Sequence, residues 1–262
     1  MPTTYAHDLF GKMVYHRVAP EIQKLISEHK TSYIIGLHGP DILFYTRPFY
    51  RNRVNGLGFE LHRRIAAEFF EAGKQLYRKE RNDEVLAYLL GFVCHFMLDS
   101  TCHPYIAQYM KKTGAAHDAT ETELDRKLML NTGKNPFRYH PSCVIKREPK
   151  SIRAISQVLE GMSEKDIAHT LAGMKFYTNL LVCHTSLKRR LLRWVARLTG
   201  VYYFMRGKII LKKPRKNCIE STRELERLFK RAVPETAAVM EGYYRSVMEN
   251  HGLDARFNRN YK

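Results

Sequence analysis

The sequence predicts an all-α protein built as a bundle of many helices. Apolar residues recur three and four positions apart across residues 57–69 and again across residues 85–97, which is the spacing of one helix face. Neither half of the chain shows the alternation of apolar and polar residues, or the paired turn motifs, that strands require. At 262 residues the chain can bury a sizeable core, as one large domain or two small ones.

Proline and glycine mark the first element boundaries. Pro20 separates two short N-terminal helices. Residues 36–40 predict a turn that places His38 and Asp41 on irregular backbone. The helix that follows carries His62 on its apolar side, where a buried imidazole must be hydrogen-bonded or ligated.

A more apolar helix comes next and carries His95 and Asp99. Because Pro104 directly follows His103, we expect this helix to kink or end there. A polar connector that contains a glycine then leads to a helix beginning near His117.

The remaining elements carry less information. Residues 131–149 predict a loop, because they hold one glycine and three prolines. The residues after about 220 are rich in Glu and Arg at helical spacing and predict packing helices without identifiable chemistry. Residues 257–262 show no pattern of their own.

Histidines and carboxylates recur at intervals of four residues in the first half of the chain. His95, Asp99 and His103 follow one another at this spacing, and His117 and Glu121 repeat it. Positions i and i+4 share a helix face, so each pair can ligate one cation. Imidazole nitrogen and carboxylate oxygen suit zinc first, and other divalent metals as well.

The number of these residues predicts more than one ion. With His62 there are six candidate ligands, and a structural zinc site takes about four. We therefore expect the bundle to bury a polynuclear metal site. Two ions about 4 Å apart could clamp a phosphodiester while one supplies hydroxide, which points to hydrolysis. A single histidine on an apolar helix is more often a hydrogen-bonded core residue, and it is the recurrence that favours metal.

Cysteine usage and apolar runs bear on the compartment. Five cysteines form no CxxC pair, and their odd number fits a reduced interior better than a disulfide framework. No signal peptide is visible, and no stretch approaches the roughly 20 apolar residues of a membrane span. We expect a cytoplasmic protein with one domain at residues 1–262, divided into a metal-binding part at 1–140 and a basic helical part at 141–262.

Four short motifs carry a resemblance to a known family. TTYAH lies near the start of the given sequence and LHGPD some thirty residues later. The stretch HFMLDSTCHPY and then HDATE follow them. Together they resemble the zinc-dependent phospholipase C family, in particular bacterial intracellular members, whose all-helical fold is shared with single-strand-specific zinc nucleases. The resemblance is specific for residues 1–140 and thin beyond them. It implies an enzyme that uses zinc-activated water to cleave a phospholipid-like phosphodiester.

The resemblance also implies the ligands of two or three zinc ions, namely His7, Asp41, His62, His95, Asp99, His103, His117 and Glu121. It divides them over three positions: His62, His95 and Asp99, with Asp41 as an optional fourth; His103, His117 and Glu121; and His7, with Asp99 as the bridge. In the family the residue matching Asp41 is a candidate for steering or deprotonating the attacking water. The implied catalytic residues are therefore Asp41 and Asp99.

Three features of the chain depart from the family pattern and bear on this assignment of ligands. Secreted members use the α-amino group and carbonyl of a processed N-terminal Trp as ligands, whereas this chain begins Met1-Pro2, so we expect a weak or absent third metal. The step from Asp99 to His103 is shorter than in secreted relatives, which alters the local helix end. His38 is either a further ligand or a loop histidine bonded to backbone.

The positive charge of the chain is concentrated in one segment. Residues 167–219 contain no Asp or Glu and hold twelve cations, two thirds of the net charge of +18. The cations are Lys175, Lys188, Arg189, Arg190, Arg193, Arg197, Arg206, Lys208, Lys212, Lys213, Arg215 and Lys216. Leucines and aromatic residues are interleaved with them, a composition typical of segments that bind an anionic membrane surface.

Three functions fit these patterns. The favoured one is a phospholipase C-like phosphodiesterase whose residues 188–216 bind an anionic membrane. A single-strand nuclease on the same scaffold is the alternative, in which the cations follow a nucleic-acid backbone. A zinc-stabilised interaction protein on membrane or RNA is the third, if protein ligands close every metal position. For the basic segment we also consider a packing helix whose apolar side lies in the core. The sequence leaves the oligomeric state open.

Overall fold

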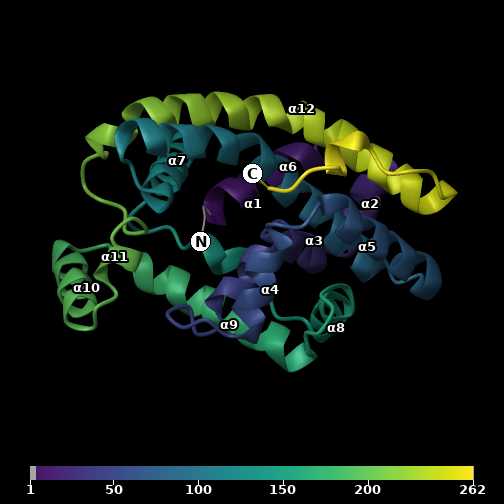
Figure 1. The fold of residues 1–262 in the computed structure, drawn as a ribbon, viewed down its shortest axis with the longest axis horizontal. Coiled ribbons are helices and arrows are strands. Elements are labelled where there is room, and N and C mark those ends of the chain that lie inside the picture. The colour runs from purple at the N-terminus through teal and green to yellow at the C-terminus, as the bar shows by residue number, and fades with distance from the viewer. Residues whose placement is uncertain (1–3, 262) are drawn as a thin grey trace.

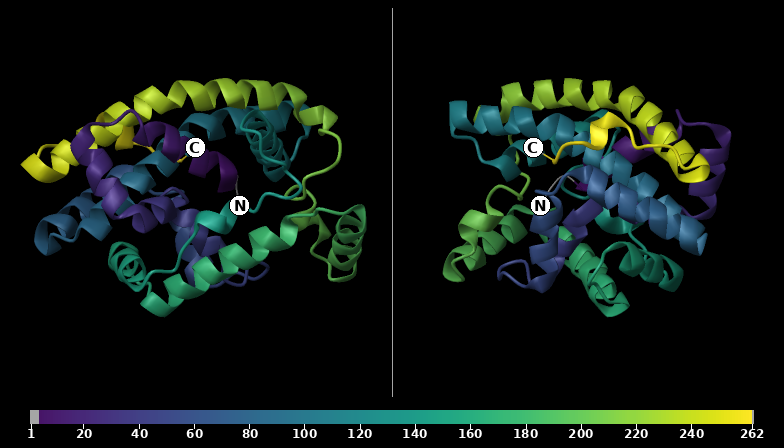
Figure 2. Two further views of the ribbon diagram at one scale, coloured as in Figure 1. Left: turned by 180° about the vertical axis from the view of Figure 1, so that it is seen from behind. Right: turned by 45° about the vertical axis from the view of Figure 1, so that its right-hand side comes forward.

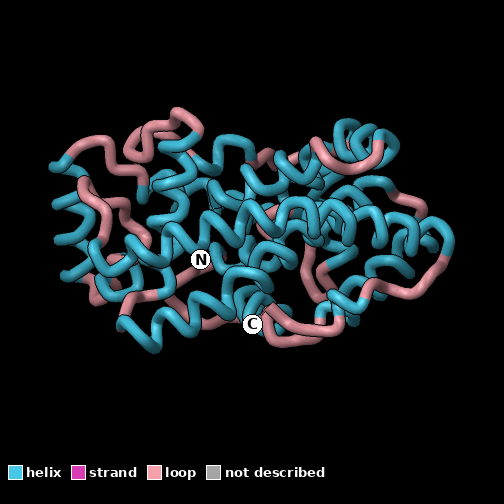
Figure 3. Tube along the Cα trace, turned by 90° about the horizontal axis from the view of Figure 1, so that it is seen from above, coloured by secondary structure: helices cyan, strands magenta, loops and turns pink. Residues whose placement is uncertain are grey.

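The computed structural model describes residues 4–261 and consists of helices joined by short loops. The described chain contains α1 Thr4–Tyr15, α2 Pro20–Glu28, α3 Lys30–Gly36, η1 Gly39–Tyr45, α4 Arg53–Leu61, α5 Ala66–Glu80, α6 Asp83–Thr113, α7 His117–Asn131, η2 Pro141–Val144, α8 Pro149–Val158, α9 Glu164–Leu181, α10 Ser186–Leu198, α11 Tyr202–Met205, η3 Lys216–Cys218, α12 Ile219–Glu249 and η4 Ala255–Phe257. The four labelled η are 3-10 helices. No strand occurs among residues 4–261, so the all-α prediction is confirmed (Figure 3).

The helices lie in two groups, one on each side of the central helix α6. Helix α12 runs along one side above α7 and α6, while α8, α9 and α10 lie on the other side (Figure 1). Helix α6 packs most extensively against α3 and α12. Buried apolar residues of these elements, α10 excepted, join in one main cluster that extends from Tyr5 to Tyr261.

Helix α6 is the core of the bundle. Almost every side chain from Glu84 to Cys102 is buried. By length and composition alone the helix is apolar enough to cross a membrane, but its most apolar window is entirely buried inside the protein. The expectation that no stretch approaches a membrane span is therefore wrong. A helix enclosed by other helices is apolar on all sides for the same reason that a spanning helix is.

Pro104 does not end α6, which continues to Thr113. A proline has no N–H, so it leaves the carbonyl four residues earlier without its helical partner. In this chain the carbonyl of Ser100 accepts a hydrogen bond from Arg259 Nη2 at 2.8 Å instead. The predicted alternative of a helix end at Pro104 is therefore wrong, and a kink stays a prediction. Because the donor comes from the far end of the chain, local sequence rules could not show that the helix continues.

The apolar pattern across residues 57–69 spans two helices rather than one. Helix α4 ends at Leu61 and α5 begins at Ala66, with a turn between them. Ile65, which the pattern counts as an inward residue, is 47% exposed. The turn leaves His62 at the end of α4.

Two glycines bring α3 and α6 into close contact. A Cβ atom on Gly36 would lie 2.2 Å from the carbonyl oxygen of Tyr88, and one on Gly91 would lie 2.2 Å from the carbonyl oxygen of Tyr33. Only glycine permits backbones to approach this closely. The contact sets the direction of the chain that leaves α3 and enters η1.

Candidate metal centre

Eight side chains from five elements converge at the centre of the bundle. They are His7 of α1, Asp41 of η1, His62 at the end of α4, His95, Asp99 and His103 of α6, and His117 and Glu121 of α7. They form three groups in which the ligand atoms all lie within 4.8 Å of one another. The groups are His7, His95 and Asp99; Asp41, His62 and His95; and His103, His117 and Glu121.

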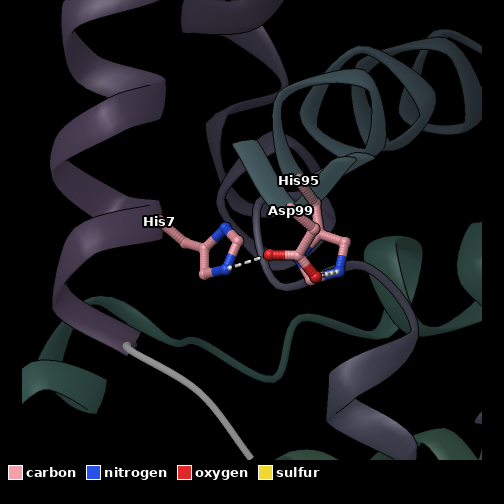
Figure 4. Close-up of side chains that lie close together, drawn as sticks. All are labelled: His7, His95 and Asp99. Atoms are coloured by element: carbon pink, nitrogen blue, oxygen red, sulfur yellow. Dashed lines mark ion pairs between the residues drawn. The ribbon is translucent and has the colours of Figure 1, made fainter. Parts of the chain in front are cut away.

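Asp99 lies at the middle of this cluster. Its Oδ1 is 3.3 Å from His7 Nε2, and its Oδ2 is 3.3 Å from His95 Nε2 and 3.6 Å from His103 Nε2. Figure 4 shows the imidazole of His7 reaching from α1 towards Asp99 and His95 of α6. The carboxylate therefore connects residues of two groups, the arrangement that a bridging ligand needs.

The two outer groups are similarly close. Asp41 Oδ1 is 3.2 Å from His62 Nε2. Glu121 Oε1 is 2.9 Å from His117 Nε2 and 3.5 Å from His103 Nε2. The structure thus brings together all eight residues predicted as ligands. It places Asp41, rather than Asp99, in the compact group with His62.

The donor set fits metal ions better than hydrogen bonds. Several buried atoms of these residues have no hydrogen-bond partner within residues 4–261: His7 Nδ1, Asp41 Oδ2, both ring nitrogens of His95, Asp99 Oδ2 and Glu121 Oε2. A buried polar group without a partner is costly. Most separations within the groups are also longer than hydrogen bonds and close to the roughly 3.3 Å between neighbouring ligands of a tetrahedral zinc ion.

The electrostatics of the cluster set the protonation of its ligands. Burial favours a neutral carboxyl, but the neighbouring histidines outweigh it and hold the pKa of Asp99 and the pKa of Glu121 below their ordinary values. Burial lowers the pKa of His95 to about 4, so that imidazole is neutral. Burial lowers the pKa of His103, but Asp99 and Glu121 outweigh this effect and raise the pKa to about 9. A cation that binds to His103 would therefore displace a proton.

A comparison with known families supports the same chemistry. Residues 1–238 match the model of a family described as zinc dependent phospholipase C. The chain belongs to this family. The match continues well past residue 140, where the sequence motifs become thin, and it includes the basic segment. No curated protein and no solved structure matches the chain.

Backbone carbonyls orient two of the histidines in this zinc-dependent phospholipase C family member. His62 Nδ1 lies 2.7 Å from the carbonyl oxygen of Gly58, and His103 Nδ1 lies 3.1 Å from that of Tyr261. An N–H donated to a carbonyl from Nδ1 leaves Nε2 as the free ligand atom. In both residues Nε2 is the atom that faces a carboxylate of the cluster.

Asp125 positions the helix that carries His7. This buried residue of α7 accepts hydrogen bonds from the backbone N–H groups of Tyr5 and Ala6, at 3.3 and 2.8 Å. Burial raises the pKa of Asp125 to about 7, although these two bonds oppose the shift. Its spacing of four residues from Glu121 was a signal available in the sequence, and the prediction missed it.

Tyr261 covers the cluster from the C-terminal side. Its ring centroid lies 4.8 Å from that of His62 and 5.8 Å from that of His95. The interpretation of residues 257–262 as uninformative is therefore wrong for their place in the structure. Tyr261 also lies beyond the residues matched by the family model, and no local pattern marked it.

His38 is buried close to the cluster, with its ring centroid 6.5 Å from that of His7. Its Nε2 has no hydrogen-bond partner among the described residues. Burial and the neighbouring histidines lower its pKa to about 3. None of the three groups found in residues 4–261 includes it. The N-terminal amine, the other ligand in question, lies outside the described residues.

The cluster is accessible from one side. His117 has 39% of its side chain exposed, whereas His7 and His95 are buried. A cavity of about 400 Å³ lies beside it, bordered by Phe44, whose ring centroid is 5.5 Å from that of His62. Asp118, adjacent to His117 in the chain, also lines this cavity.

Proposed function

We propose that the chain is a zinc-dependent phosphodiesterase that cleaves phospholipids in the manner of a phospholipase C. One observation carries the proposal: eight nitrogen- and oxygen-donor side chains converge in three adjoining groups, and several of their atoms are buried without a hydrogen-bond partner in the part of the chain that the structure describes. Each group supplies three protein donors. Catalytic zinc sites typically have three protein ligands and one open position, so the donor count favours a catalytic centre over a closed structural site.

Bound zinc ions would supply an acidified water and Lewis acidity at a phosphoryl oxygen. The chain's own residues then have separate tasks. Asp99 connects its own group, with His7 and His95, to the group that contains His103, and it carries negative charge that offsets the cations. Asp41 has one oxygen facing His62 and a second, Oδ2, for which the described residues offer no hydrogen-bond partner. That second oxygen is free to orient the attacking water and to take its proton.

The cavity beside the cluster supports a substrate with an apolar part and a phosphate. Its walls include the rings of Phe44, Phe59 and Phe204, and its charged groups are Arg51 and the ion pair of Lys208 with Asp118. Aromatic walls bind the apolar part and the cations attract the phosphate. A phospholipid combines both features in one molecule.

A nuclease remains the second candidate, and the same cavity favours it. The aromatic rings that would contact a lipid could also stack on bases, and the net charge of +18 suits a polyanion. A substrate panel separates the candidates. Zinc-loaded protein is incubated with phosphatidylcholine, phosphatidylglycerol and single-stranded DNA, and the released products are measured.

We expect release of a diacylglycerol and a phosphorylated head group, lost on chelation and restored by zinc. Cleavage of the oligonucleotide alone would replace this function by that of a nuclease. Turnover of none of the substrates by zinc-loaded protein would favour the third possibility, an interaction protein stabilised by zinc.

A further inference from the structure

Helix α10 turns its apolar face to the solvent. Five apolar side chains of this helix are between 41% and 73% exposed: Leu187, Leu191, Trp194, Val195 and Leu198. Their spacing of three and four residues places them in one stripe. An ordinary packing helix would bury that stripe, so the alternative of a helix with its apolar side in the core is wrong.

Cationic side chains on the inward side of α10 attach this helix to the rest of the protein. Arg189 Nη2 donates to the carbonyl oxygen of Cys183 at 3.0 Å, and its guanidinium lies 5.2 Å from the ring centroid of Phe137. Lys188 Nζ donates to the carbonyl oxygen of Val182 at 2.7 Å. These bonds tie α10 to the chain that follows α9, and they leave the apolar stripe facing outward.

The exposed surface continues beyond α10. Figure 2 shows α10 and α11 together at one edge of the molecule in both views. Tyr203 of α11 is 77% exposed. The ring centroid of Phe204 lies 5.5 Å from that of Phe49, and the neighbouring Tyr50 is 75% exposed. Aromatic rings thus extend the apolar stripe towards the cavity beside the metal centre.

Exposed cations accompany this surface. They are Arg190, Arg197, Arg206, Lys212, Lys213 and Lys216. No acidic residue occurs between residues 167 and 219. A stripe of leucines and a tryptophan beside such cations complements an anionic bilayer, whose head groups attract the charge while its acyl region accepts the apolar side chains.

We infer that residues 186–206, which contain α10 and α11, form a docking element that inserts the apolar face of α10 into an anionic lipid surface. A nucleic acid fits this surface less well, because it stacks on aromatic rings but has no apolar region to receive the four aliphatic side chains of the stripe. Trp194 and Tyr203 are residue types that favour the level of the head groups.

Docking would turn the proposed substrate cavity towards the bilayer. Phe49, Tyr50 and Phe204 line that cavity. Phe204 belongs to the docking element, and its ring contacts that of Phe49. This orientation rests on the proposed function, whereas the docking itself does not.

Trp194 provides a direct test, because it is the only tryptophan in the chain. The zinc-loaded full chain is titrated with vesicles of phosphatidylcholine alone and of phosphatidylcholine mixed with phosphatidylglycerol. We expect the emission of Trp194 to shift to shorter wavelength with the mixed vesicles, and to be quenched by lipids brominated in their acyl chains. Emission that stays at its value in buffer overturns the proposal. A change caused by single-stranded oligonucleotide and not by vesicles overturns it as well.

A triple variant tests the stripe itself, and its substitutions are Leu187→Gln, Leu191→Gln and Leu198→Gln. Its binding to mixed vesicles, measured by cosedimentation, should fall by more than about tenfold. The matched control carries Ile65→Gln, Leu130→Gln and Ile219→Gln, at apolar positions of other elements that are 46% to 54% exposed. The control should bind like the unmodified chain, and an equal loss in both variants would refute the docking element.

Hydrolysis by the triple variant separates docking from catalysis. On a short-chain phospholipid below its micelle concentration, the triple variant should match the unmodified chain, and on vesicles it should be slower. An equal loss on both substrates would contradict a surface role. If the unmodified chain binds mixed vesicles but hydrolyses neither substrate, docking stands and the proposed hydrolase function fails.

Discussion

Asp99 lies between three histidines of the metal centre, which face its two oxygens at 3.3 to 3.6 Å. We predict that Asp99→Asn keeps the helical fold and lowers hydrolysis by at least about a hundredfold, because the amide removes the bridging charge. Steady-state kinetics and the zinc content of the variant check this. Asp83→Asn, the same substitution at a half-buried position of α6 outside the three donor groups, is the control. Full activity in the Asp99 variant would refute the bridging role.

Gly39 controls the space available to His95. Its φ angle is +47°, and a Cβ atom there would lie 2.3 Å from Cδ2 of His95. We predict that Gly39→Ala lowers the free energy of unfolding by about 2 kcal/mol and reduces zinc occupancy. Chemical denaturation and elemental analysis measure the two effects.

The control for this substitution is Gly56→Ala in α4, where a Cβ atom would meet no heavy atom within 4 Å. It should be neutral or raise stability by up to about 1 kcal/mol. Similar losses in both variants would mean that the space beside His95 is not limiting.

At the residue scale the ligands were predictable because helical spacing brings i and i+4 together. Five of the eight, from His95 to Glu121, lie on two helices and follow this rule. Asp125 and Tyr261 were not predicted. Asp125 accepts hydrogen bonds from the backbone of α1. Tyr261 contacts His62 and His103, which both lie more than 150 residues earlier in the chain. Such contacts depend on the tertiary arrangement rather than on a local pattern.

At the element scale, Glu84 joins α3, α6 and α8. Its carboxylate accepts from His29 Nδ1 and Lys150 Nζ, each at 2.8 Å, and from the hydroxyl of Ser32. Burial opposes ionisation, but these partners outweigh it and lower the pKa of Glu84 from 4.5 to about 2. A carboxyl group with a lowered pKa in the folded state stabilises the fold above its unfolded pKa. That stabilisation is lost as the pH falls towards the folded pKa.

We therefore predict that Glu84→Gln destabilises the protein by about 2 kcal/mol at pH 6. The difference from the unmodified chain should shrink between about pH 4.5 and pH 2. Urea unfolding of both proteins across this range measures it, and subtracting the two curves removes the acid sensitivity of the metal centre that they share. A difference that is constant with pH would contradict the role of the carboxylate.

Element boundaries were predictable where the chain itself supplies the breaker. Pro20 begins α2, and His117 begins α7 after the connector that contains Gly114. The end of α6 was not predictable from Pro104, because Arg259 satisfies the carbonyl that the proline leaves open. The turn between α4 and α5 was hidden because its flanking helices continue the same apolar spacing.

At the scale of the whole molecule, five elements supply the donor groups of the metal centre. Without cations these buried carboxylates and imidazoles lack compensation. We predict that removal of zinc with a chelator lowers the melting temperature by about 5 °C or more, and that added zinc restores it. Scanning calorimetry with and without chelator checks this. An unchanged melting temperature after verified removal of zinc would show that the centre contributes nothing to stability.

The basic segment shows what composition can and cannot predict about a surface. Its charge indicated an anionic partner, and its interleaved leucines indicated an amphipathic helix. Which face of α10 points outward depends on the bonds of Lys188 and Arg189 to the preceding backbone carbonyls. The sequence pattern instead predicted Lys188 and Arg189 among the cations that bind the membrane. The single domain and the cytoplasmic location stay predictions.

The central claim is that this fold encloses a polynuclear zinc centre. The most direct measurement is the number of zinc ions per chain, determined by elemental analysis of protein purified without an affinity tag, equilibrated with zinc and then dialysed. Two or three ions per chain is the result we predict from the three adjoining donor groups. One ion or none would contradict the polynuclear centre.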